Sequence, residues 1–118
     1  MNTALGIDIG GSGIKGALVD CDSGVLLTKR HRIETPHPAT PDAVALATRA
    51  VMDHFSMTEE IPIGVTLPAV VRNGVVRTAA NIDPTWIGTH GVDLFRRPWG
   101  GARHYSMMLM LQDWQRWL

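Results

Sequence analysis

The sequence has little cysteine and no surplus of charge, and each shortage excludes a class of protein. A single cysteine, Cys21, rules out an internal disulfide and suits a reducing compartment. The 11 basic and 11 acidic residues balance, so there is no electrostatic reason to expect nucleic acid or an anionic membrane as a partner. The five histidines are scattered, without the spacing of metal ligands.

Long apolar runs are missing as well. No run reaches the roughly 18 apolar residues that a membrane span needs. The start of the chain, MNTALGIDIGG, lacks the basic residues and the long apolar core of a signal peptide. We therefore expect a cytoplasmic protein without a membrane partner. With 118 residues, 45% of them apolar, the chain suffices for one small domain.

The pattern that is present is that of an α/β domain. Apolar runs predict strands at Thr3–Gly10, Gly13–Asp20 and Gly24–Thr35, and the turn CDSG makes them an antiparallel meander. A helix is expected to begin after Thr40, a natural N-cap, with Pro41 at its first position, and to end at residues 54–56.

The second half of the pattern is a strand followed by a hairpin. A buried strand is predicted within Ile61–Val71, and Asn73-Gly74 is the best hairpin signal in the chain. A polar and aromatic loop follows over Ala79–Gly88, in which we expect Trp86 to pack in the core.

One stretch carries the chemistry: DIGGSGIK, from Asp8 to Lys15. Three glycines at a strand end leave backbone N–H groups open to a phosphate, while Ser12 adds a hydroxyl and Lys15 a positive charge. Asp8 would repel phosphates directly, so it makes sense as the holder of Mg²⁺ or its waters. The spacing fits neither a Walker loop nor a Rossmann fingerprint, and a glycine-rich hairpin without a ligand is the alternative.

The pattern D-x-G-G-[ST]-x-x-K between two strands resembles the first phosphate motif of the actin-like ATPase superfamily, in its sugar-kinase branch. LGIDIGGSGIKGALVD and IGVTLPAVVRNGVVRTAANIDPTWIG together resemble the ROK family, and TAANID..WIG most resembles its polyphosphate glucokinases. The resemblance covers about Leu5–Phe95. It implies an actin-like, ribonuclease-H-like α/β fold, truncated to the N-terminal lobe at residues 1–95, with a β-meander, a helix and further strands.

The resemblance also implies an activity and a set of site residues. The activity is transfer of a phosphoryl group from inorganic polyphosphate or ATP to the 6-hydroxyl of glucose, with Mg²⁺ as cofactor, in proteins that are commonly homodimers. The preference between the two donors stays open. Asp8 would be the metal-binding residue. The implied phosphate-binding residues are Asp8, Gly10, Gly11, Ser12, Gly13 and Lys15.

Pro68, Asn81 and Asp83 correspond to positions beside the sugar. An amide and a carboxylate suit hydroxyl recognition, because each anchors a particular O–H direction. The family usually has glycine where this chain has Ala69, which would crowd the loop. Capping of the turn around Pro84 is the alternative role of Asn81 and Asp83.

The basic run from Lys29 to Arg32 is expected to lie on a solvated strand edge. A polyphosphate-binding patch is the alternative.

The catalytic base of the family is not found. In the family it is an aspartate in an Asn-Asp-Ala segment shortly after the position of Phe95, and no Asn-Asp pair follows Phe95 here. The family's zinc motif and second lobe are also absent from these residues. We therefore assign no catalytic residue and expect this polypeptide to be inactive alone. The alternative is a non-catalytic phosphate- or sugar-binding remnant or a ROK-type regulatory module, although a repressor is disfavoured because a strand already begins at Thr3.

Residues 96–118 have a different composition, with three of the four Trp and three of the six Met. In a shifted reading frame, the junctions Met107-Met108, Asp113-Trp114 and Trp114-Gln115 must encode Asp, Leu and Ala. With permissible codons elsewhere, His104–Leu118 then reads Leu-Phe-Asn-Asp-Ala-Asp-Ala-Ala-Gly-Leu-Ala-Glu-Met-Ala. This is very close to the family's catalytic segment, so we hypothesise that the gene shifted frame near Arg97–Trp99.

A rival interpretation takes the tail as selected sequence. Its apolar residues fall on one helical face, which would give a short amphipathic helix that docks on the domain, on a partner or at a membrane surface. The residues on that face are Met107, Met110, Leu111, Trp114 and Leu118.

Overall fold

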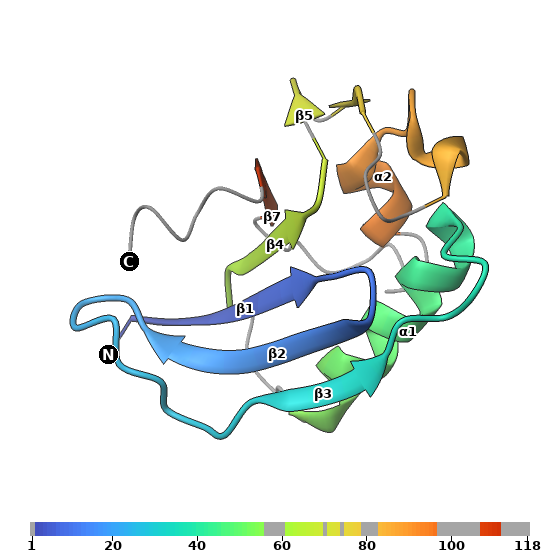
Figure 1. Ribbon diagram of the computed structural model, residues 1–118. Helices are drawn as coiled ribbons and strands as arrows, with labels where there is room; N and C mark the ends of the chain where they lie inside the picture. The colour runs from blue at the N-terminus through green and yellow to red at the C-terminus, as the bar shows by residue number, and fades with distance from the viewer. Residues whose placement is uncertain are drawn as a thin grey trace.

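The computed structural model describes residues 2–55, 61–69, 71–73, 75–78, 83–96 and 107–111. Within these residues the strands form a sheet in the order β3-β2-β1-β4-β7 and a separate small hairpin, β5-β6 (Figure 1). The predicted α/β class is thus confirmed.

The first three strands form the predicted meander. β1 (Thr3–Ile9) pairs antiparallel with β2 (Gly13–Asp20), and β2 pairs antiparallel with β3 (His31–Glu34). The third strand is shorter than predicted, because residues 25–27 join the sheet only through an isolated bridge from Leu26 to Val19. Val25, Leu26 and Leu27 are 59%, 41% and 43% exposed, so no burial stabilises a longer strand.

Helix α1 (Pro41–His54) begins where its sequence predicts. The Thr40 side chain accepts a hydrogen bond from the Ala43 N–H at 3.4 Å, and Pro41 occupies the first turn. The helix contacts β2 and β3 and covers one face of the sheet (Figure 1). It approaches closely because Gly16 has no side chain: a Cβ there would lie 2.6 Å from Val51 Cγ1.

A ring contact between β3 and the end of α1 adds to this packing. The imidazoles of His31 and His54 stack with their centroids 3.6 Å apart, and the Phe55 ring meets both edge-on. No local pattern predicts this pair, since the two histidines are far apart along the chain.

Two parallel strands extend the sheet beyond β1. β4 (Ile63–Leu67) pairs parallel with β1, and β7 (Met107–Leu111) pairs parallel with β4. The helical alternative for the tail is therefore wrong at Met107–Leu111; Trp114 and Leu118 lie outside the described residues. A five-residue apolar run fits either period, and the open backbone groups of β4 favour the strand.

The remaining elements close one end of the core. β5 (Val71–Arg72) and β6 (Val75–Val76) form the predicted hairpin, in which Asn73 adopts a φ of +52°. The 3-10 helix η1 (Pro84–Trp86) and helix α2 (Gly91–Arg96) follow.

Trp86 is completely buried, as predicted, and its ring lies 6.3 Å from that of Phe95. Its indole N–H donates to the Ala39 carbonyl at 2.8 Å. None of the described helices is long and apolar enough to cross a membrane.

Candidate phosphate-binding site

The glycine loop lies at the edge where the parallel strands end. Asp8 on β1 is level with Thr66 on β4, so Gly10 and Pro68 both follow two residues later at the same edge. In open α/β sheets, ligands bind at the carboxyl ends of parallel strands. The β1–β2 turn lies on the side of the sheet where α1 begins (Figure 1). The topology therefore brings the predicted phosphate loop and the Pro68 loop to one edge.

The glycine loop, residues 10–13, is held by backbone hydrogen bonds and by Thr35. The Gly10 N–H donates to the Gly13 carbonyl at 2.9 Å. Thr35, only 2% exposed, donates its hydroxyl to the Gly10 carbonyl at 2.7 Å and its N–H to the Ser12 carbonyl at 3.1 Å. The carbonyls of Gly10, Ser12 and Gly13 are thus engaged. Sequence reasoning missed Thr35, because its role depends on a contact across 25 residues.

The N–H groups of the loop differ from its carbonyls in their hydrogen bonding. Within the part of the chain that the structure describes, the N–H groups of Gly11 and Ser12 have no hydrogen-bond partner. Gly11 is half-buried and Ser12 is exposed, so solvent reaches this turn. Successive accessible N–H groups at a tight turn form a concavity that favours an anion.

A polar row crosses the sheet beside this loop. The registers place Thr66, Asp8, Lys15 and Arg32 opposite one another on β4, β1, β2 and β3. Strand side chains alternate between faces, and Ile7 and Ile9 are buried, so this row occupies the face away from that core. The predicted Asp8 and Lys15 are therefore neighbours on one face.

Thr66 orients the carboxylate of Asp8. Its hydroxyl lies 2.8 Å from Asp8 Oδ1 and 3.5 Å from the Ile7 carbonyl. Among the described residues Asp8 makes no ion pair, even with Lys15. Sequence reasoning missed Thr66; the available signal was a polar residue between the buried Val65 and Leu67.

Asp8 offers one carboxylate ligand for Mg²⁺. No group of three or more His, Cys, Asp or Glu side chains gathers in the described part of the chain. Mg²⁺ is typically held by one or two carboxylates, substrate phosphates and several waters, so it does not need such a group. A single oriented carboxylate beside a phosphate loop matches that arrangement.

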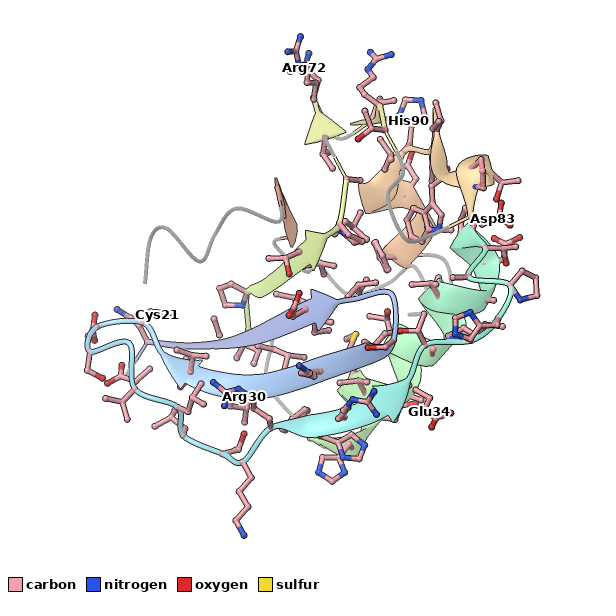
Figure 2. The ribbon with its side chains drawn as sticks, in the orientation of Figure 1. Cys21, Arg30, Glu34, Arg72, Asp83 and His90 are labelled. Atoms are coloured by element: carbon pink, nitrogen blue, oxygen red, sulfur yellow. The ribbon has the colours of Figure 1, made fainter. Side chains whose placement is uncertain are left out.

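The predicted sugar-binding residues are less closely connected to the loop. Pro68 is buried, and Ala69 is 7% exposed and packs in the core. Asn81 lies outside the described residues. Asp83 is held near the start of α1, because its N–H donates to the Ala39 carbonyl at 3.4 Å (Figure 2). No hydrogen bond or ion pair among the described residues joins Asp83 to the glycine loop.

Asp83 also has the capping role that was its alternative. Its Oδ1 accepts hydrogen bonds from the Thr85 hydroxyl at 2.6 Å and from the Thr85 N–H at 2.9 Å. These two bonds favour the ionised form and lower the pKa of Asp83 below its ordinary value of 3.8.

Comparison with known proteins identifies the fold and several similar proteins. No family model matches the chain. In structure it resembles the inorganic polyphosphate/ATP-glucomannokinase of Arthrobacter sp. strain KM, with a TM-score of 0.83, 39% identity, and coverage of 94% of this chain and 44% of that one. A ROK family glucokinase from Streptomyces griseus shares the fold, with a TM-score of 0.74 at 24% identity, over 92% of this chain and 33% of that one.

The chain therefore has the actin-like ATPase fold of the ROK sugar kinases, over the part of that fold which it covers. In sequence it is 52% identical over 98 residues to the polyphosphate glucokinase of Mycobacterium tuberculosis strain ATCC 25618 / H37Rv. That match covers 83% of this chain and 36% of the relative, so the chain spans about a third of the length of the curated relative.

Proposed function

We propose that this chain is the phosphate-donor lobe of a glucokinase that transfers a phosphoryl group from inorganic polyphosphate or ATP to the 6-hydroxyl of glucose. The observation that carries the proposal is the glycine loop, which exposes the N–H groups of Gly11 and Ser12 beside the oriented carboxylate of Asp8. The similarity to a polyphosphate glucokinase and to a polyphosphate/ATP-glucomannokinase supports it.

In this proposal the loop holds the donor and positions its terminal phosphate. The N–H groups of Gly11 and Ser12 donate to non-bridging phosphate oxygens, and Lys15 neutralises part of the donor charge. Gly10 keeps the turn tight enough for close approach, since a Cβ on Gly10 would lie 3.1 Å from the Gly13 carbonyl oxygen.

Asp8 is the proposed metal-binding residue, with Thr66 holding its Oδ1. When bound, Mg²⁺ supplies charge neutralisation at the donor phosphates. The contribution of this chain is to fix the carboxylate beside the loop, so that metal and phosphate bind together.

The acceptor sugar is assigned to the Pro68 loop and to Asn81 and Asp83. The support is their residue type and their match to the family pattern. The Thr85 bonds of Asp83 fix one carboxylate oxygen, and an oriented carboxylate suits recognition of a single sugar hydroxyl.

We propose that residues 1–95 are the kinase lobe and that residues 96–118 were read in a shifted frame. The 118 residues printed above contain no Asn-Asp pair after Phe95, so we propose that they bind the donor without transferring its phosphate by themselves. That same observation favours the second candidate function, a non-catalytic phosphate-binding module. A cytoplasmic location and a homodimeric full-length protein remain part of the proposal.

The test is titration of the 118-residue chain with inorganic polyphosphate, with and without Mg²⁺, by calorimetry. Asp8→Asn keeps the shape and removes the charge. Without Mg²⁺ the variant should bind polyphosphate at least as tightly as wild type, because a repulsive charge is gone. With Mg²⁺ the variant should bind polyphosphate more weakly than wild type does, because the metal has lost its carboxylate ligand.

The matched control is Asp22→Asn, which removes the same charge at an exposed turn away from the loop. Its Mg²⁺ dependence should equal that of wild type. Absence of polyphosphate binding by wild type, or equal Mg²⁺ dependence in all three proteins, would contradict the proposed function.

A further inference from the structure

Arg32 lies over the glycine loop rather than away from it. It is an exposed residue of β3, the outer strand of the sheet, and its Nη2 donates to the Ser12 carbonyl at 3.1 Å. Figure 2 shows Arg30 and Glu34 near opposite ends of β3, with Glu34 on the side of the loop. Of the basic run 29–32, Arg32 is therefore the residue that the fold delivers to the loop.

The glycine at position 13 makes this placement possible. A Cβ on Gly13 would lie 2.7 Å from both Cζ and Nη2 of Arg32, and in closer conflict with Nε. The guanidinium consequently rests on the bare backbone of the loop. This gives Gly13 a role besides turn geometry, since its φ is not in the left-handed range that only glycine adopts easily.

The charges around Arg32 leave its guanidinium available. Lys15 is its partner across the β2–β3 pair, and Glu34 stands two residues along the same face. Among the described residues Arg32 makes no ion pair, and its hydrogen bond goes to a neutral carbonyl. A guanidinium carries five N–H donors in a planar fork that matches a phosphate group, so most of its donors remain unused.

We propose that Arg32 is a second cationic contact of the donor site, which binds a phosphate of an inorganic polyphosphate chain further along than those held by the glycine loop. The inference rests on the proposed function. Lys15 and Arg32 present two positive charges side by side at the loop, which suits a linear polyanion that bears charge at every unit. The proposed function assigns no role to a residue of β3. A contact at Arg32 would therefore make the binding affinity depend on the length of the polyphosphate donor.

The experiment measures binding of long-chain inorganic polyphosphate to the 118-residue chain, with pyrophosphate as the short comparison. Arg32→Ala should weaken long-chain binding about tenfold, the value of one charge-assisted contact at an accessible site, and should reduce the slope of log affinity against log salt by about 1. Pyrophosphate binding should change less than about twofold. Arg32→Lys should recover part of the loss, because it keeps the charge without the fork.

Arg30→Ala is the matched control, because it removes the same charge from the same exposed run. It should change long-chain binding by less than about twofold. Circular dichroism and thermal unfolding of each variant establish that it is folded. Equal effects of Arg32→Ala and Arg30→Ala would overturn the inference while leaving the donor loop intact. Failure of wild type to bind polyphosphate would instead overturn the proposed function, and this inference with it.

A double-mutant cycle gives a second, independent readout. Gly13→Ala leaves the charge of Arg32 in place but displaces its guanidinium from the loop. If Arg32 binds polyphosphate from that position, Gly13→Ala should weaken polyphosphate binding when Arg32 is present. The same substitution should have a much smaller effect in the Arg32→Ala background. Strictly additive losses would contradict the proposed role.

Discussion

Thr66→Val removes a single hydrogen bond from the proposed metal-binding carboxylate. Valine has the shape of threonine and suits a strand, so packing of β4 is preserved. The loss is the 2.8 Å hydrogen bond to Asp8 Oδ1, since the second contact of the hydroxyl is already long at 3.5 Å. Hydrogen bonds to charged groups contribute about 1.5–3 kcal/mol, and Asp8 is half-buried, so water offsets part of the loss. We expect about 1 kcal/mol, or roughly a fivefold weaker Mg²⁺-dependent binding of polyphosphate.

The assay is calorimetric titration with polyphosphate at fixed Mg²⁺. Thr66→Ser should restore wild-type affinity, because it keeps the hydroxyl. In the Asp8→Asn background the effect of Thr66→Val should largely disappear, since the oriented charge is already gone. A merely structural effect would persist in that background. An unchanged affinity in Thr66→Val, or the same loss with and without Asp8, would refute the positioning role of Thr66.

Three further predictions concern packing, pH and the gene. In urea denaturation, Gly16→Ala should lower the free energy of unfolding by about 1–3 kcal/mol, because its Cβ would meet Val51. Gly64→Ala should not lower it, because nothing lies within 4 Å of the added Cβ. Equal effects of the two substitutions would refute the close packing of α1. The stabilisation from Asp83 should be present above pH 3.8 and be lost as pH falls through its lowered pKa. The difference in unfolding midpoint between wild type and Asp83→Asn should therefore shrink at acidic pH, and a constant difference would contradict the capping role. Sequencing of the coding DNA should find Asn-Asp-Ala codons in another frame across His104–Leu118, and codons that exclude them would end the frameshift hypothesis.

The parts of the fold that follow local rules could be predicted from the sequence. Thr40 and Pro41 fix the start of α1, and Asn73 takes the left-handed conformation that a tight hairpin requires. The meander and the buried strand at residues 63–67 follow from apolar runs between turns. The predicted core position of Trp86 is confirmed, since the residue is completely buried.

The parts that depend on distant contacts could not be predicted. The third strand is short because residues 25–27 are exposed and join the sheet only through an isolated bridge, which no local pattern reveals. The segment at residues 107–111 is a strand because β4 offers it a partner.

In the candidate site, the local pattern predicts the glycine loop, Asp8 and Lys15, and these residues stay a prediction. The contribution of Thr35 and Thr66 depends on sheet register across 25 and 58 residues.

The measurement that tests the donor site most directly is an ¹H–¹⁵N correlation spectrum of the chain during titration with inorganic polyphosphate and Mg²⁺. We predict that the largest shifts occur at the amides of Gly11 and Ser12, whose N–H groups have no partner among the described residues. Shifts should extend to Lys15 and to the Arg32 Nε–H. A spectrum in which residues 10–15 do not move, or in which the shifts centre on Lys29 and Arg30, would contradict the phosphate-binding role of the glycine loop.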